Sequence, residues 1–364
     1  NNQLKNVIFG FVIMIVASYV NYHRIVRLGW GWFWLLAAVA IIAALKTPLA
    51  HSELGATRWI KLGPVSFQAA EPIKAAIIIF FAYYVSYWGL NRWYNQLLAC
   101  LLAIALLGFL FFFSNNLSTV IVLFCICAVI ILSSVKKPDL YVYFLLGLVL
   151  IIIAAIFVTV YLLMHQGAEN FRFVRIRAWL HPEEYAADEG LQAMQARYAI
   201  GAGGFWGKGL GQSLIKFKLS YSYNDFILAI ICEELGVFGV IVMMTLFGYL
   251  LYRIYKIAQN AWDIEGKVLA IGVFTQIALQ LLINVMVVTS VIPTTGVTLP
   301  FFSAGGTSVV FLLAELGMVL NVDKYAKERR FFEEAERHVA QMEQRGGIGA
   351  AGWRRRLDSA RTRR

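Results

Sequence analysis

The sequence RFVRIRAWLHPEEYAADEGLQAMQARYAIGAGGFWGKGLGQSLIKFKLSYSYNDFILAIICEELG, residues Arg172–Gly236, is a polar, glycine-punctuated stretch inside an otherwise almost continuously apolar chain. Of the 364 residues, 60% are hydrophobic and 15% are aromatic. A typical soluble domain is only about half apolar. Apolar runs of about 17 to 25 residues, long enough to cross a hydrocarbon core about 30 Å thick, flank the polar stretch. The pattern predicts an all-α polytopic membrane protein with one large polar loop.

The apolar runs divide the chain into a transmembrane domain, 1–322, and a tail, 323–364. Nine spans are predicted, at residues 6–20, 30–45, 72–88, 97–113, 117–134, 140–165, 226–257, 268–292 and 307–322. The connection 166–225 exceeds the usual loop length, which is typical of functional loops. The segment 291–306, VIPTTGVTLPFFSAGG, is apolar but rich in Pro and Gly, which favours a re-entrant loop covered by helices.

Basic residues in the connections predict the orientation, because Lys and Arg favour the cytoplasmic side. They occupy alternate connections, at Arg24 and Arg27, Arg92, Lys136 and Lys137, and Arg253 with Lys256. The tail then faces the cytoplasm, and the loop 166–225 faces outward. The connection 46–71 is basic on the outer side, against this rule, which indicates a function there. Nine spans place Asn1 outside, so we expect one more helix upstream.

The formal net charge of +11 does not indicate nucleic acid, because much of it lies in the tail. Residues 323–364 contain twelve Lys and Arg against seven Asp and Glu, a pattern typical of binding to anionic lipid or to a partner. We expect this tail to be poorly ordered. The four cysteines lie in apolar segments and suggest neither disulfides nor a zinc site.

Asp225 is the sharpest chemical candidate, because it places a carboxylate where the polar loop meets an apolar span. A structural role is the alternative: Ser222-x-x-Asp225 fits a capping box, and a carboxylate is stable at the positive end of a helix dipole. Glu233 and Glu234 follow in the same span, where ionisable groups either serve a function or lie near a helix break at Gly236.

Two further charged sets precede the long loop. Glu71 and Lys74 share one helix face and are able to pair. Arg58 and Trp59 lie outside, where snorkelling to headgroups and aromatic anchoring are the structural alternatives to ligand binding. The loop itself carries more cations than acids, among them Arg175, which suits an anionic substrate such as a lipid phosphate.

The glycine-rich run YAIGAGGFWGKGLGQS matches no phosphate-binding motif and lacks a strand–helix context. Its glycines, including Gly201, Gly203 and Gly204, are interpreted as turn-forming positions where the loop meets the bundle.

Four blocks of this sequence together resemble one family. They are GATRWIKLGPVSFQAAEPIK, LSTVIVL, the region from RIRAWLHPEE through GLQAMQARYAIGAGGFWGKGLGQS to NDFILAIICEELG, and IPTTGVTLPFFSAGGTS. In order and spacing they are similar to the SEDS family of FtsW, RodA and SpoVE, and closer to FtsW or SpoVE of Gram-positive bacteria than to RodA. The chain departs from the family pattern at Ala69, Ala70, Tyr223 and Ala304, which leaves the charged set intact.

The resemblance implies a ten-span bundle and a set of site residues. Asp225 matches the family's essential loop aspartate. The matches to its substrate-binding positions are Arg58, Trp59, Glu71, Lys74, Arg175, Gln192, Gln195 and Ser303. The structural motif of the re-entrant loop is matched by Pro293, Gly296, Pro300, Gly305 and Gly306.

The same resemblance implies the activity: polymerisation of lipid II into glycan strands at the outer face of the bacterial cytoplasmic membrane, for cell division or cell shape. Asp225 would act as general base, with no organic cofactor and with a divalent cation, Mg²⁺ or Mn²⁺, as a candidate. The implied partners are lipid II, a class B penicillin-binding protein and other divisome or elongasome membrane proteins. The alternatives are a lipid II flippase, since broken helices and charges at midplane are typical of transporters, and a non-catalytic scaffold.

Overall fold

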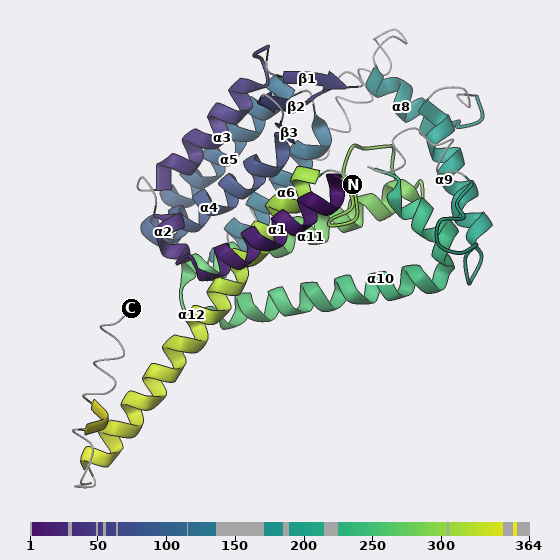
Figure 1. Cartoon of the computed structure of the whole chain (residues 1–364). Helices are drawn as coiled ribbons and strands as arrows, with labels where there is room; N and C mark the ends of the chain where they lie inside the picture. The colour runs from purple at the N-terminus through teal and green to yellow at the C-terminus, as the bar shows by residue number, and fades with distance from the viewer. Residues whose placement is uncertain are drawn as a thin grey trace.

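The computed structural model describes residues 2–27, 31–48, 50–53, 56–62, 65–114, 116–135, 171–184, 189–214, 225–303, 306–344 and 352–354. The predicted span 140–165 and three motif positions, Gly305, Ala304 and Tyr223, lie outside these ranges, as does most of the basic end of the tail. The described residues form a bundle of helices with a small sheet at one end (Figure 1).

The strands of the sheet lie between α3 and α4 in the chain, and helices precede and follow them. The helices are α1 (Asn2–Tyr19), α2 (Tyr22–Val26), α3 (Trp32–Ala44), α4 (Ala70–Trp88), α5 (Trp93–Ser114), α6 (Leu117–Ser134), α8 (Phe171–Leu180), α9 (Glu189–Gly203), α10 (Ile227–Asn260), α11 (Ile264–Val288) and α12 (Gly306–Gln344). The strands are β1 (Ala50–Glu53), β2 (Ala56–Leu62) and β3 (Val65–Gln68).

Five of these helices, α5, α6, α10, α11 and α12, are long and apolar enough to cross a membrane. Helices α1 and α3 are apolar but shorter, and the 13 residues of α3 extend only about 20 Å at 1.5 Å per residue. The prediction of a multi-span helical protein is therefore confirmed. The predicted number of nine spans stays a prediction.

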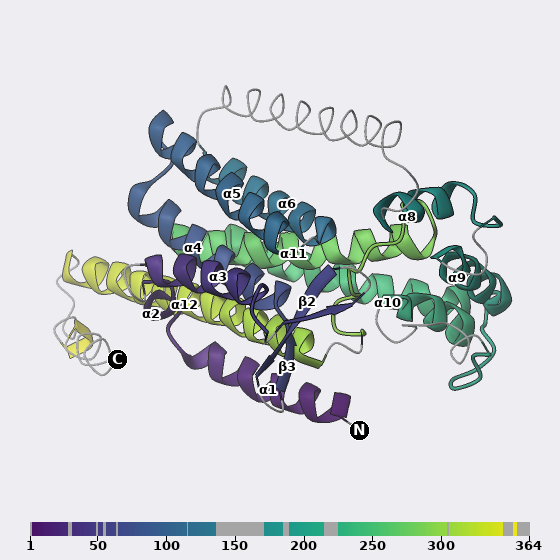
Figure 2. The same ribbon diagram turned by 90° about the horizontal axis from the view of Figure 1, so that it is seen from above.

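The core is built around α11, which packs against α4, α6, α10 and α12. Figure 2 shows α11 running through the middle of the bundle, with α5 and α6 on one side and α12 on the other. Val273 and Ile277 of α11 and Ile73 and Phe81 of α4 are fully buried. Since α4 is buried along most of its length, its polar residues lie inside the protein.

The connection 46–71 differs from the predicted all-α fold, because it contains an antiparallel sheet in the order β1-β2-β3. Trp59 in β2 pairs with Gln68 in β3, and Ile60, which is buried, pairs with Phe67. Ile60 is buried and its neighbour Lys61 is exposed, which suits a half-buried strand. Strand β3 passes through Ala69 directly into α4, so the sheet fixes where α4 begins.

Helix α12 extends well past the predicted end of its span at residue 322 and continues to Gln344. Figure 1 shows it projecting from the bundle as one straight element. The extension is surface helix, with a pair between Lys327 and Asp323 one turn apart at 2.6 Å. The first half of the tail is thus helical, and the poor order expected of its Gly-rich, basic end stays a prediction.

Helix α10 breaks at Gly236, whose φ of 67° and ψ of −170° lie outside the helical range. The backbone of 204–209 fills this break, forming four hydrogen bonds of 2.9–3.1 Å with the backbone of 233–238. Glu233, fully buried, binds Lys208 Nζ at 2.7 Å and accepts from the Ser213 hydroxyl at 2.5 Å. In the glycine-rich run, Gly204, Gly207, Gly209 and Gly211 have positive φ, whereas Gly201 and Gly203 lie at the end of α9. The contacts of Glu233 favour its structural role.

A glycine at residue 203 is required by this close approach of backbones. A Cβ there would lie 2.0 Å from the Cys232 carbonyl oxygen, whereas a Cβ at Gly201 in the same helix would meet nothing within 4 Å. We expect Gly203→Ala to lower the free energy of unfolding by about 1–3 kcal/mol, because the backbone must shift. Gly201→Ala should be neutral or stabilising by up to about 1 kcal/mol. Thermal unfolding in detergent measures both, and equal midpoints would contradict the packing argument.

Candidate functional site

A pocket of about 290 Å³ opens where β3 passes into α4. Four segments far apart in the sequence line it. The lining residues are Gln68, Ala70, Glu71, Lys74, Thr119, Val122, Gln280, Gly296, Val297 and Thr298. A second pocket of about 240 Å³, with Leu45, Ile73 and Leu110 in its wall, adjoins it through Gln68, Ala70 and Thr119. The first pocket is the more polar of the two, and the second, which shares these wall residues, is the more apolar.

The charged pair in the polar pocket comes from the first turns of α4. Lys74 Nζ lies 2.8 Å from Glu71 Oε1, and the two side chains are only 3% and 2% exposed. The predicted pairing is therefore confirmed. The second oxygen, Glu71 Oε2, is buried and accepts no hydrogen bond from the described residues. A buried carboxylate oxygen without a donor at a pocket wall is available to a ligand, a cation or water.

Polar side chains of α11 form a row along the face that points into the core. Gln276, Gln280 and Asn284 are spaced by four residues, so they lie on one side of the helix, and all are at most 3% exposed. Gln276 Nε2 donates to Glu315 Oε2 of α12 at 2.9 Å. The acceptor oxygens of all three amides have no hydrogen-bond donor among the described residues. The row therefore presents oxygen atoms to the interior beside the pocket.

Asn284 joins two segments that lie 72 positions apart. Its Nδ2 donates to the Asp225 carbonyl at 2.9 Å and to the Val297 carbonyl at 2.9 Å. Val297 lines the pocket, so one amide ties the backbone of Asp225 to the pocket wall. Sequence reasoning missed Asn284 and the row to which it belongs. The available signal was the repeat of polar residues every four positions inside an apolar span.

Asp225 precedes α10 instead of lying inside it. The helix begins at Ile227, and its N-cap is Phe226, whose side chain makes no capping hydrogen bond. The capping-box interpretation, which needs Asp225 at the third helical position, is therefore wrong. Asp225 is partly buried and lies at the boundary between the long loop and the bundle, as the sequence predicted.

The other candidate residues lie in β2, in the pocket wall and in helices α8 and α9. Trp59 lies in β2 beside the start of α4, and Gly296 lines the pocket. Gln192 and Gln195 lie in α9, and Gln195 Oε1 is buried without a donor among the described residues. Arg58 and Arg175 belong to β2 and α8, and their side chains fall outside the described part of the structure.

The segment between α11 and α12 is irregular and largely covered, with Leu299 only 1% exposed. The Ser303 hydroxyl accepts a hydrogen bond from the Leu299 amide at 2.8 Å, so this side chain closes a turn. Pro293 and Pro300 lie in the same segment, and Gly306 begins α12. Substrate binding by Ser303 stays a prediction.

Comparisons with known proteins agree over nearly the whole chain. The family model FTSW_RODA_SPOVE, described as a cell cycle protein, matches residues 1–328. The stage V sporulation protein E of Bacillus subtilis is 37% identical over 280 residues, 75% of this chain and 73% of the relative. A Bacillus subtilis protein described as a probable peptidoglycan glycosyltransferase FtsW is 32% identical over 333 residues, 89% of this chain and 81% of the relative.

A solved structure shares the fold. That structure is described as "Structural coordination of polymerization and crosslinking by a peptidoglycan synthase complex". The similar chain in it gives a TM-score of 0.71 at 23% identity, covering 89% of this chain and 88% of that chain. At this identity the likeness shows the helical multi-span fold alone.

The buried pair predicts a large effect on stability. Lys74→Met leaves Glu71 as a buried charge without its partner, so we expect the free energy of unfolding to fall by about 3–5 kcal/mol. The double variant Glu71→Leu/Lys74→Met removes both charges and should recover most of this loss. Denaturation in detergent measures each. Lys327→Met, in an exposed pair, is the matched control and should change stability by less than about 1 kcal/mol. A single variant as stable as the double would contradict the pairing.

The bridge made by Asn284 predicts a second effect. Asn284→Leu keeps a similar volume but leaves the buried carbonyls of Asp225 and Val297 without a donor, at about 1–3 kcal/mol each. We expect a lower unfolding midpoint and faster hydrogen exchange around Val297. Asn260→Leu at the exposed end of α10 serves as control. If both variants unfold at the same midpoint, Asn284 does not hold these segments together.

Proposed function

This chain belongs to the FtsW/RodA/SpoVE family, and from that premise we propose that it is a peptidoglycan glycosyltransferase that polymerises lipid II at the outer face of the cytoplasmic membrane. Several relatives, from 31% to 32% identical, are described as probable peptidoglycan glycosyltransferases. The observation that carries the proposal is the pocket with a buried Lys–Glu pair in its wall, to which Asn284 ties the backbone of Asp225 through Val297.

The chemistry of the substrate requires one base. Lipid II carries its disaccharide on an undecaprenyl pyrophosphate, and this leaving group is already stable as an anion. The second carboxylic acid that glycosidases use to protonate the leaving group is therefore not needed. The acceptor 4-hydroxyl attacks the donor's anomeric carbon with inversion, the bond to pyrophosphate breaks, and Asp225 takes the hydroxyl proton.

Lys74 supplies positive charge on the opposite side of the reaction. It lies in the pocket wall, and its partner Glu71 fixes the direction of its ammonium group. We assign it, together with Arg58 of β2, to the pyrophosphate, because charge builds up on that group as the bond breaks. The basic residues of the long loop, Arg175 among them, would draw the anionic lipid toward this place.

The pocket also fits a divalent cation. Glu71 Oε2 and Gln280 Oε1 both belong to pocket-lining residues, and neither accepts a hydrogen bond within the described residues. Carboxylate and amide oxygens are the ligands that Mg²⁺ and Mn²⁺ prefer. These two residues would hold the ion, which when bound would withdraw charge from a phosphate oxygen.

The adjoining apolar pocket supports a lipid-linked substrate. Its wall contains the apolar side chains Leu45, Ile73 and Leu110, and it shares the polar residues Gln68 and Thr119 with the Glu71 pocket. A molecule with a charged head and a hydrocarbon chain matches this division. Gln192, Gln195 and Trp59 are proposed to contact the sugars. The proposed partner is a class B penicillin-binding protein, together with other divisome or elongasome membrane proteins.

Asp225→Asn tests the proposed base. It keeps the shape of the side chain but removes its proton affinity, so polymerisation of lipid II in detergent should fall by about 10²–10⁴-fold, since this is the usual worth of a general base. Gel analysis of glycan strands measures the product. Asp323→Asn in the α12 extension, far along the chain from the pocket, is the matched control and should retain full activity.

The same assay separates the alternatives. Polymer formed in detergent, where no membrane separates two compartments, excludes a protein that only flips lipid II. Unchanged product from a folded Asp225→Asn variant would remove Asp225 from the mechanism. Absence of product from the wild-type chain, with and without a class B penicillin-binding protein, would contradict the proposed activity itself.

A further inference from the structure

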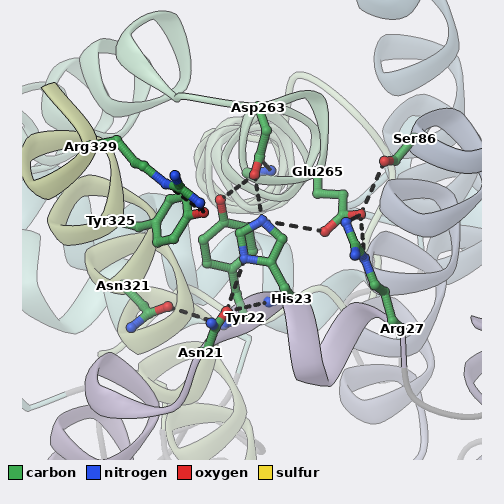
Figure 3. Close-up of polar contacts among 11 residues, drawn as sticks. Asn21, Tyr22, His23, Arg27, Ser86, Asp263, Glu265, Asn321, Tyr325 and Arg329 are labelled. Atoms are coloured by element: carbon green, nitrogen blue, oxygen red, sulfur yellow. Dashed lines mark hydrogen bonds and ion pairs between the residues drawn. The ribbon is translucent and has the colours of Figure 1, made fainter. Parts of the chain in front are cut away.

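We propose that His23, Asp263 and Glu265 form a binding site for a divalent transition-metal ion at the end of the bundle opposite the pocket. Figure 3 shows the three side chains converging from α2 and from the start of α11. One ligand atom from each lies within 4.8 Å of the others. About 22 Å of α4, at 1.5 Å per residue, separates Glu71 in the pocket from Ser86, which contacts this cluster.

The ring of His23 lies between two hydrogen-bond acceptors. Asn21 Oδ1 is 2.9 Å from Nδ1, and the same oxygen accepts from the His23 backbone amide at 2.9 Å, which identifies it as the acceptor atom of the amide. Nδ1 therefore carries the ring proton. Nε2 faces Asp263 Oδ2 at 2.6 Å, which is a second acceptor. A neutral imidazole has one N–H only, so the close approach of Nε2 to this carboxylate calls for either a second ring proton or a metal ion bound by both groups.

The position of Glu265 favours a metal ion over a proton at His23 Nε2. Its Oε2 is buried, lies 3.8 Å from the same Nε2 and has no hydrogen-bond donor among the described residues. A proton on Nε2 serves a single acceptor, Asp263, and leaves this oxygen unsatisfied. A metal ion binds Nε2 and both carboxylates together. Two ligands at about 2.0–2.2 Å from one metal are at most about 4.4 Å apart. His23 Nε2 lies 2.6 Å from Asp263 Oδ2 and 3.8 Å from Glu265 Oε2, and the three ligand atoms lie within 4.8 Å of one another, so small side-chain shifts bring all three to one ion.

The groups around Asp263 hold it as a charged ligand. The Gly266 amide donates to Asp263 Oδ1 at 2.7 Å, and the Tyr22 hydroxyl donates to Asp263 Oδ2 at 2.7 Å. Both hydrogen bonds favour the charged form of a carboxylate. Hydrogen bonds of this kind to a ligating carboxylate are typical of metal sites, as is the Asn21 contact that orients the ring.

The remaining charged groups leave room for a cation. Arg27 binds Glu265 Oε1 at 2.9 Å through a side chain that is 63% exposed, so it neutralises one oxygen and leaves the other facing inward. Arg329 of α12 instead binds the Tyr325 hydroxyl, whose ring packs 4.8 Å from the His23 ring. One imidazole and two carboxylates suit Zn²⁺ or Mn²⁺ better than Mg²⁺. Such an ion would tie α2 to the start of α11.

Metal content measures the site directly, without reference to activity. The full chain, purified in detergent without a histidine tag, is stripped with a chelator and dialysed against Zn²⁺ or Mn²⁺. We expect about one tightly bound ion per chain, as in a structural site. His23→Gln and Asp263→Asn should lose it. Co²⁺ loaded in its place should give visible absorption bands that His23→Gln abolishes.

Two variants separate ligation from misfolding and from surface binding. Asn21→Leu removes the acceptor of Nδ1 and of the His23 backbone amide without touching a ligand atom, and it should weaken binding by about 10- to 100-fold, whereas Asn21→Asp keeps the acceptor and the affinity. His338→Gln removes an exposed histidine of α12 and should leave binding unchanged. The proposal is overturned if the wild-type chain retains no Zn²⁺ or Mn²⁺, which would leave a protonated His23 in the cluster, or if His338→Gln lowers binding as much as His23→Gln.

Discussion

Inside a bilayer, backbone amides and carbonyls must find partners within the protein, because no water is available to replace a missing hydrogen bond. This constraint governs two places in the described structure where the backbone departs from helix, the break in α10 and the segment between α11 and α12. At Gly236 the freed groups of α10 pair with the backbone of 204–209. Between α11 and α12 the irregular segment is held by Asn284 and closed by Ser303. The candidate site exists because both irregular segments are satisfied from within.

The same constraint explains why buried polar side chains gather at two ends of the bundle. At one end the Lys74–Glu71 pair and the amides of α11 surround the pocket. At the other, His23, Asp263 and Glu265 meet beside Ser86 of α4 and Tyr325 of α12. Between them α4 is apolar and buried. The helix thus separates two polar regions, and a change in one reaches the other only through helix packing.

Local sequence patterns correctly predicted features that depend on residues close together in the chain. The spacing of Glu71 and Lys74 placed both on one face of a helix, and their pairing is observed. The glycine-rich run was predicted to form turns, and it does so against α10. The capping box failed because the pattern Ser-x-x-Asp says nothing about where the loop ends, and α10 begins at Ile227. The sheet of 50–68 was missed because short strands beside a membrane resemble an ordinary loop in hydropathy.

Hydropathy and the order of the motifs are properties of the linear sequence. They were sufficient to identify a helical membrane protein of one family with a large polar loop. The packing of the helices was needed to find that Asn284 links Asp225 to Val297 and that Gln280 lines the pocket opened by Glu71. Packing also brings His23 to Asp263 across 240 positions. The physical reason is that a periodic polar residue indicates which face of a helix it occupies, whereas its partner depends on which helices pack together.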